Sequence, residues 1–312
     1  MLVNHIIRNR RRSEGRKREK MENLQKEYEK QVTSNRMKQR ISGCMILVGI
    51  VCMVIALLNR SNTPLMILFF ALTVASCVVG VVIGEQGKKK FSTYVGQTVT
   101  RKVLEQHFKV DEFIMSGETP LDEIHKTELH WNYNRIIGSR VIRGSLDGVH
   151  FQCSNVVLDE TVGTANKNTR VFCGQYVFLD LKEKADGIIR VIDKENPVRK
   201  PVQGCRPVKI SSVQEFDDLF EVFATDQAAA RKYLTEERRE ALLELKRLLS
   251  EKGGEEKAQL NLMVKGRKLC AALGDGIFLF HRQNEKGTVD NIIEYNQLDA
   301  EFVQKALRLL MI

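Results

Sequence analysis

The sequence predicts an α+β protein, in which an N-terminal transmembrane helical hairpin precedes a soluble domain on antiparallel sheet with C-terminal helices. Two uncharged apolar runs, at 41–59 and 64–84, predict the hairpin. Strand-like runs followed by helical ones, without a repeated βαβ alternation, predict the sheet domain. The chain thus divides into a basic arm over 1–40, the hairpin over 41–84 and a cytoplasmic α+β domain over 85–312.

The composition is that of a folded protein whose charge is unevenly distributed. Of 312 residues, 43% are hydrophobic and 28% are charged, which excludes a disordered or collagen-like chain. The formal net charge is +10, and residues 1–40 alone carry 13 Lys and Arg against five Asp and Glu. The arm therefore holds most of the basic excess, and residues 85–312 are close to neutral.

A dense cationic cluster marks the arm, and from 14 to 40 the chain lacks proline and predicts a helix with a narrow apolar stripe. We expect the cluster to bind the membrane surface, because each basic side chain held near an anionic leaflet contributes about 1 kcal/mol. A solubilising tail that sets topology is the alternative. A nucleic-acid partner is not expected, since no aromatic residues are interleaved with the cluster. The cluster consists of Arg8, Arg10, Arg11, Arg12, Arg16, Lys17, Arg18 and Lys20, and the stripe of Met21, Leu24, Tyr28 and Val32.

Each apolar run is long enough to cross a bilayer. At 1.5 Å per residue, runs of 19 and 21 residues extend about 30 Å, which is the thickness of the hydrocarbon core. Buried core helices are the alternative, but these are usually shorter and contain polar residues. Neither run contains an ionisable residue other than Cys, so we interpret the hairpin as an anchor and not as a transporter or channel. Close helix packing is predicted at small residues, namely Gly43, Gly49, Ala71, Ala75, Ser76 and Gly80.

Basic residues near the ends of the runs predict the orientation. Arg36, Lys38 and Arg40 precede the first run and Lys88–Lys90 follow the second, whereas the connecting loop has Arg60 alone. Because cytoplasmic flanks carry the excess of Lys and Arg, both termini are expected in the cytoplasm. A cleavable signal peptide is not expected, since 40 residues rich in charge precede the first run. The predicted location is the inner or plasma membrane of the cell, with two passes.

The sheet is predicted from period-two alternation and turn signals. Runs at 135–143 and 149–153 flank an Asp147-Gly148 turn and predict a β-hairpin. Apolar runs at 171–179 and 187–193 predict central strands. Three more short strands are predicted near the C-terminus, at 260–264, 269–273 and 277–281.

Three helices are predicted between and after these strands. A capping box at Ser212–Glu215 predicts a helix with Phe216, Leu219, Phe220 and Phe223 on one face. A second helix begins after Thr235 and ends at Gly253-Gly254. Asp299 is the predicted N-cap of a final helix.

Motifs for local catalytic chemistry are absent from the sequence. There is no CxxC, GxSxG, Walker A or GxGxxG motif, so no catalytic residue, metal ligand or cofactor is predicted. His125, Glu128 and His130 resemble a metalloprotease string but lack its four-residue spacing, so we assign them a surface or core-edge role. Asp180 and Asp193 form an acid–base pair only if the fold happens to bring them together. The seven cysteines are interpreted as structural thiols, at positions 44, 52, 77, 153, 173, 205 and 270.

Several short motifs over about residues 85–312 carry a family resemblance. They are Tyr133-Asn134-Arg135 with Gly138 and Gly144, Phe172-Cys173-Gly174-Gln175-Tyr176 with Asp180, Glu215-Phe216, Phe220-Glu221-Val222-Phe223 with Asp226, and Arg231 to Thr235. On these residues the chain resembles a bacterial family catalogued as domain of unknown function, family 3137. The family's pattern has acidic residues where Ser139 and Arg140 stand here. The resemblance implies two N-terminal membrane helices and a soluble domain, and it transfers no catalytic residue.

Three functions are compatible with these features. The leading hypothesis is a membrane-anchored, non-catalytic binding module whose partners are the bilayer, anionic lipid at the arm, and a protein or lipid headgroup at the cytoplasmic domain. The alternatives are a membrane-tethered hydrolase with a non-local site and a structural or assembly factor. A concave cluster holding His150 or His281 beside a carboxylate favours the hydrolase, and a filled apolar interior there counts against it.

Overall fold

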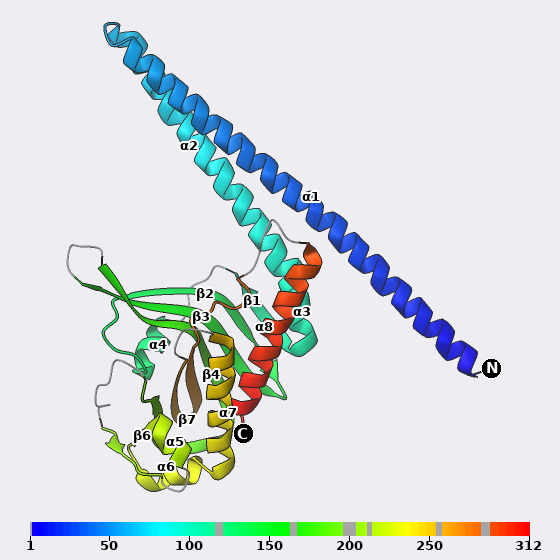
Figure 1. The fold of residues 1–312 in the computed structure, drawn as a ribbon, viewed down its shortest axis with the longest axis vertical. Coiled ribbons are helices and arrows are strands. Elements are labelled where there is room, and N and C mark those ends of the chain that lie inside the picture. Colours follow the sequence, from blue (N-terminus) through cyan, green and yellow to red (C-terminus); the bar gives the residue numbers. More distant parts are fainter. Residues whose placement is uncertain are drawn as a thin grey trace. The chain divides into compact units, whose positions relative to one another are not determined.

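The computed structural model describes residues 2–115, 121–162, 167–195, 204–210, 214–253, 258–281 and 288–312. They form two compact units, each described by itself. The first unit comprises Met1–Val99 with Gln283–Ile293, and the second comprises Thr100–Arg282 with Glu294–Ile312. The fold class is α+β, as predicted (Figure 1).

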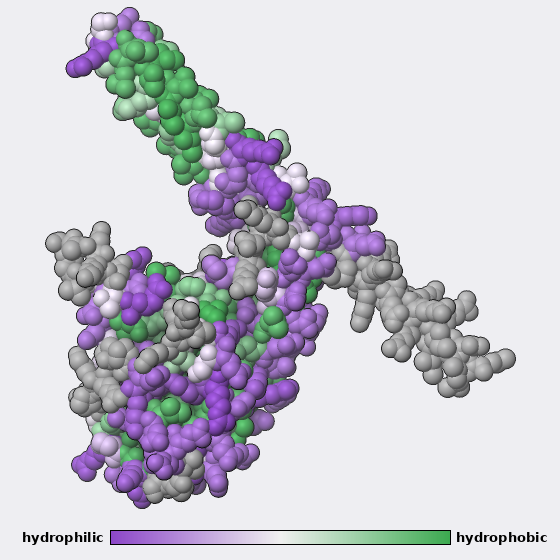
Figure 2. All heavy atoms as spheres, in the orientation of Figure 1, coloured by the Kyte–Doolittle hydropathy of each residue, from purple (hydrophilic) through white to green (hydrophobic). Residues whose placement is uncertain are grey.

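Two long antiparallel helices, α1 (Leu2–Leu58) and α2 (Thr63–Tyr94), build the first unit (Figure 1). The Asn62 side chain caps α2 by accepting from the Leu65 amide, and Pro64 stands in the first turn, where its missing N–H costs nothing. Most of the large apolar side chains that the described residues expose lie between Ile41 and Val82, and Figure 2 shows this apolar surface around the end of the hairpin. Both helices are long and apolar enough to cross a membrane, and only 17% of each most apolar stretch is buried. Core helices of a soluble protein bury most of such a stretch.

Glycines and small polar groups form the contact between α1 and α2. A Cβ added at Gly80 would lie 3.0 Å from the Ser42 carbonyl oxygen, and one at Gly84 would lie 2.9 Å from Ser42 Oγ. Such contacts leave no room for a larger side chain. The predicted close packing is confirmed at Gly49, Ser76 and Gly80. It is wrong at Gly43, which has no neighbour within 4 Å of an added Cβ, and at the exposed Ala71 and Ala75.

A small apolar cluster lies near the C-terminal end of α2. Tyr28 and Val32 of α1 pack against Phe91 of α2 and against Val289 and Ile292, which belong to the first turn of α8 (Val289–Leu310). Half of the predicted stripe of the arm is therefore a buried contact; the side chains of its other two members, at 21 and 24, lie outside the described residues. A π-helical turn, η1 (Val95–Thr100), and α3 (Arg101–His107) continue the chain after α2.

An antiparallel seven-stranded sheet forms the centre of the second unit. The order is β1-β2-β3-β4-β6-β5, and β7 pairs with the other edge of β4. The predicted hairpin is confirmed as β2–β3, where Asp147 and Gly148 take the positive φ angles of 50° and 79° that a two-residue turn requires. The strands are β1 (Lys109–Ile114), β2 (Arg135–Leu146), β3 (Val149–Val162), β4 (Lys167–Asp193), β5 (Arg206–Pro207), β6 (Phe220–Ala224) and β7 (Gln259–Gly274).

Helices cover both faces of this sheet. On one face, α4 (Leu121–Thr127) and the residues after it bury Ile124 and Leu129 against Leu158, Phe172 and Tyr176. On the other face, α7 (Glu236–Gly253) packs against β7, and α8 runs beside α7 (Figure 1). Two short helices, α5 (Gln214–Leu219) and α6 (Gln227–Tyr233), flank β6.

Five predictions about helices and strands differ from the structure. The helix expected to carry Phe220 and Phe223 ends at Leu219, because Phe220, Val222 and Ala224 alternate as the buried face of β6; Ser212 of its capping box lies outside the described residues. Residues 171–193 form one strand, and 260–273 form another that bends at Gly266. Residues 277–281 form no strand, and Asp299 lies inside α8 and caps no helix.

We expect a substitution of Gly80 by Leu to separate α1 from α2, since the new side chain would meet backbone at the contact. Cys77, which is half-buried beside Gly49, should then react several-fold faster with a maleimide in the detergent-solubilised protein. Gly43→Leu is the matched control, because space around Gly43 is open. Equal labelling of Cys77 in both variants, measured by peptide mass spectrometry, would contradict the packing.

Candidate functional site

The face of the sheet that carries α4 has an open groove with a volume of about 620 Å³. Its floor crosses five strands, because Glu112, Arg143, Gln152, Phe178 and Cys270 are successive register partners on β1, β2, β3, β4 and β7. With strands about 4.8 Å apart, this row extends about 19 Å. The groove is therefore long enough for several residues of a bound chain.

The middle of the groove is apolar and its rim is charged. Phe178 and Met263 are partly buried and pack against the core beneath α4, and Cys270 is 2% exposed. Residues of α4 border one side. The charged and titratable lining residues are Asp111, Glu112, Glu123, Lys126, Arg143, His150, Asp180 and Lys268.

Neighbouring strands pair their charges along the rim. Arg143 forms an ion pair with Glu112, and its Nε donates to Gln152 Oε1 at 2.8 Å. Lys268 forms an ion pair with Asp180. All four charged side chains are at least 44% exposed, so these pairs contribute little stability. Their effect is to hold the rim side chains in place beside the apolar floor.

The groove offers binding surface but no activated nucleophile among its described residues. Burial, assisted by Glu123, raises the pKa of the Cys270 thiol well above its usual value, so the thiol stays protonated. The hydroxyl of Thr127 donates to the Ile124 carbonyl oxygen at 2.7 Å. His150 and Asp180 line the same groove, so the structure brings one histidine and carboxylates together at a concave surface.

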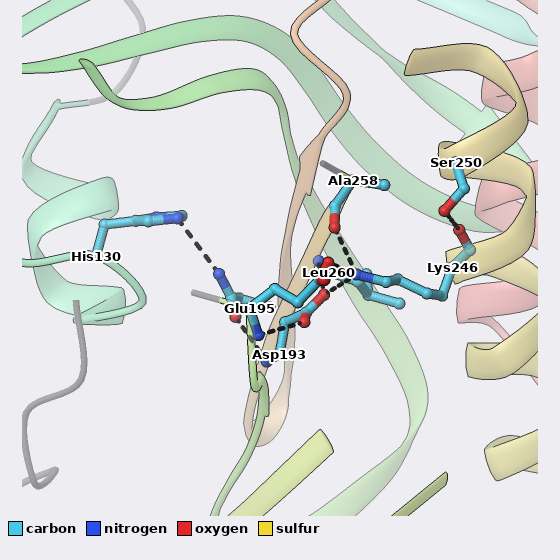
Figure 3. A network of polar contacts seen from close by, with 8 residues as sticks. His130, Asp193, Glu195, Lys246, Ser250, Ala258 and Leu260 are labelled. Atoms are coloured by element: carbon cyan, nitrogen blue, oxygen red, sulfur yellow. Dashed lines mark hydrogen bonds and ion pairs between the residues drawn. The ribbon is translucent and has the colours of Figure 1, made fainter. Parts of the chain in front are cut away.

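A buried ion pair lies at the end of β4 (Figure 3). Lys246 of α7 places its Nζ 2.5 Å from Asp193 Oδ2 and also donates to the Ala258 carbonyl oxygen at 2.5 Å. The remaining acceptor positions of the Asp193 carboxylate are used by the backbone amides of Leu260 and Glu195, both at 3.0 Å. Lys246 is 6% exposed and Asp193 is fully buried. A buried pair of this kind is stable only because its charges are fully hydrogen-bonded.

Asn261 extends this network to His130 on the far side of β7 (Figure 3). Asn261 Oδ1 accepts from the Asp193 amide at 3.0 Å, so its Nδ2 faces His130 Nε2 at 3.3 Å and donates to it. His130 therefore carries its proton on Nδ1, which lies 2.6 Å from the Tyr176 hydroxyl. Burial lowers the pKa of His130 to about 3, consistent with a neutral ring.

The predicted metalloprotease-like string has a structural role. Glu128 accepts from the buried Arg190 at 2.9 Å, His125 is exposed and stacks on Tyr133, and His130 is a core residue, more buried than the core-edge role expected. Among the described residues there is no group of three His, Cys, Asp or Glu side chains arranged to hold a metal ion. Asp180 and Asp193 do not pair with each other but with different lysines, Lys268 and Lys246.

The other predicted sites are placed as follows. The eight basic residues of the arm lie on α1, and their side chains are outside the described ones, so their role stays a prediction. All seven cysteines are free, and burial raises the pKa of Cys153 to about 12, so that thiol is inert. Sequence reasoning missed the groove floor and the Lys246–Asp193 pair. One sequence feature did indicate the groove floor: in the alternating run at 149–153, the polar Gln152 falls on the face of the strand that is predicted to be exposed.

We expect Asp193→Asn to lower the free energy of unfolding by about 3–5 kcal/mol, because it leaves the buried Lys246 ammonium with the partly exposed Glu195 carboxylate, 3.4 Å away, in place of its buried counter-ion. Urea unfolding of the full chain in detergent, followed by the fluorescence of Trp131, its single tryptophan, measures this change. Arg101→Met, which removes the exposed Arg101–Glu105 pair, is the control and should cost much less. Equal losses in the two variants would show that the buried pair is not a main support of the fold.

No curated protein matches the chain. One solved structure that resembles it is the crystal structure of the mycobacterial trehalose monomycolate transport factor A, TtfA, with 11% sequence identity, 69% of this chain and 96% of that chain covered, and a TM-score of 0.33. The family described as "Protein of unknown function (DUF3137)" matches residues 170–306, which include β6, β7, α7 and most of β4 and α8. The resemblance to this family predicted from the sequence is thereby confirmed over the matched residues.

Proposed function

We propose that this protein is a membrane-anchored, non-catalytic binding protein. The observation that carries the proposal is the apolar surface of the hairpin, where side chains such as Leu47, Leu57 and Leu58 are 62–79% exposed. In water this exposure would oppose folding, whereas in a bilayer it is the stable arrangement. In this proposal the hairpin spans the inner or plasma membrane twice and both termini are cytoplasmic. A reporter enzyme that is active only in the cytoplasm tests this topology. We expect it to be active when fused at residue 312 and inactive when inserted in the loop at 60–63.

The arm supplies a second contact with the membrane in this proposal. Its cationic cluster precedes the first span by about 20 residues on the same helix, so a lipid surface and the cluster share one side of the bilayer. Anionic lipid is the expected ligand.

The groove of the sheet domain is proposed to bind a partner protein. Its floor is apolar and extended, which fits side chains of a peptide segment better than a lipid headgroup. Of the three Lys and Arg residues that line the groove, Arg143 and Lys268 already pair with carboxylates, which makes these two less available to a headgroup phosphate.

We expect a peptide of residues 1–40 to lose at least tenfold in affinity for vesicles containing anionic lipid when Arg10–Arg12 and Arg16–Arg18 are replaced by Gln. Each of the six removed charges contributes about 1 kcal/mol to the attraction between the peptide and the anionic lipid. Sedimentation with vesicles measures binding, and replacing Lys26 and Lys30 is the control that removes charge outside the cluster. Unchanged binding of the first variant would remove the arm's proposed role.

We expect a photo-crosslinker at Lys126, beside the groove, to give one discrete adduct in intact cells. Phe178→Glu should abolish the adduct, since a carboxylate on the floor excludes an apolar side chain. A crosslinker at the exposed Glu236 on α7 is the control. An adduct that persists in the Phe178 variant, with unchanged folding by circular dichroism, would place the partner elsewhere.

A tethered hydrolase is the second candidate function, because His150 shares the groove with Asp180. Hydrolysis of a model ester by the full chain that is lost in His150→Ala would support it. Equal rates in wild type and variant would leave binding as the function.

A further inference from the structure

The segment 275–281, which follows β7, is held on the α7 side of the sheet by side chains of β3 and β4. Asn155 of β3 donates to the Leu279 carbonyl oxygen at 2.8 Å and accepts from the Leu279 amide at 3.1 Å. Gln175 of β4 donates to the Ile277 carbonyl oxygen at 2.6 Å. Asp275, at the start of the segment, has no exposed surface.

Two buried oxygens in this contact lack a hydrogen-bond donor among the described residues. Gln175 Nε2 uses both of its hydrogens, one for Ile277 O and one for Asp275 Oδ1 at 3.4 Å. Asp275 Oδ1 also accepts from the Ile277 amide at 3.0 Å. Gln175 Oε1 and Asp275 Oδ2 remain, and each is a buried acceptor without a partner. Two such acceptors on side chains that already touch are costly for a carboxylate and an amide.

One proton satisfies both atoms. We propose that Asp275 is held as a neutral carboxylic acid whose Oδ2–H donates to Gln175 Oε1, closing a cyclic acid–amide pair that fastens the segment 275–281 to β4. The pair then has two parallel hydrogen bonds, from the amide to Oδ1 and from the acid to Oε1. Every polar atom of the two side chains has a partner in this arrangement.

The charges around Asp275 are compatible with a neutral acid. Cys153 of β3 is a protonated thiol. Lys252 of α7 attracts the ionised form of Asp275, but its Nζ is 3.0 Å from Asp299 Oδ1 of α8 and is therefore already paired. Burial outweighs this attraction and raises the pKa of Asp275 to about 6. His281, at the other end of the segment, is exposed and its pKa is lowered by burial and by Arg140, so it adds no positive charge at neutral pH.

The acid–amide pair makes the attachment of the segment 275–281 to β4 dependent on pH. Because the folded state binds this proton more tightly than the unfolded chain, its stabilising effect is complete below pH 4, where Asp is protonated in both states. The effect decreases as the pH rises from about 4 to about 6. The pair therefore stabilises the segment 275–281 most below about pH 4, and its contribution is lost above about pH 6.

The test compares Asp275→Asn with Asp193→Asn in the full chain in detergent. Asn supplies at Nδ2 the hydrogen that the acid supplies at Oδ2, so Asp275→Asn should raise the urea midpoint at pH 7.5 and have little effect at pH 4. Asp193→Asn is the matched control, because that carboxylate is also buried but accepts from Lys246 and two amides. It should lower the midpoint at both.

Two results would overturn the proposal. The first is a midpoint for Asp275→Asn at pH 7.5 that is lowered as much as that of Asp193→Asn, which would show that the Asp275 charge is required. The second comes from infrared difference spectra, which do not depend on the variant's stability. A protonated carboxyl C=O band at pH 5 that survives unchanged in Asp275→Asn would belong to another residue. Loss of that band in Asp275→Asn, and an upshift in Gln175→Met as the hydrogen bonds to the acid are removed, are the expected outcomes.

Discussion

Strand β4 hydrogen-bonds with three other strands, and the second unit is organised around this pairing. Its first half lies between β3 and β7, and its second half between β6 and β7. The covering helices bury both faces of β4 at 171–179 and 188–193, which explains its apolar residues on both parities there. Its three buried polar residues, Gln175, Arg190 and Asp193, each bond a different covering segment. Through β4, the positions of α4, α7 and the segment 275–281 become mutually dependent.

The groove follows from the same arrangement. A short helix of seven residues, α4, cannot cover a face that extends over five strands. The part that it leaves open retains the alternation of a covered strand, with Phe178 in the same parity as the fully buried Tyr176. An apolar floor is thus a continuation of the core, and the paired charges at its rim keep the surrounding surface soluble.

The sequence could predict whatever depends on local pattern. The hairpin spans follow from continuous apolar runs, and the β2–β3 turn follows from Asp147-Gly148. Phe220 shows where local pattern misleads, because aromatic residues three and four apart suit a helix, yet pairing with β4 makes them a strand. The Lys246–Asp193 pair and the groove row join residues up to 158 positions apart, from Glu112 to Cys270, so only the tertiary pairing reveals them. Nothing in the local pattern around Lys246 indicates that its side chain is a buried cation.

The outer edge strand β1 affects how closely copies of this protein can gather without pairing their sheets. Its register shifts between Val110 and Glu112, and Lys109, Asp111 and Glu112 are exposed. A bulge and alternating charges are features that prevent a strand from adding to the sheet of another molecule. Copies held in a membrane by their hairpins would meet at far higher local concentration than copies free in three dimensions. An edge built in this way lets such copies crowd on one surface without joining into a continuous intermolecular sheet.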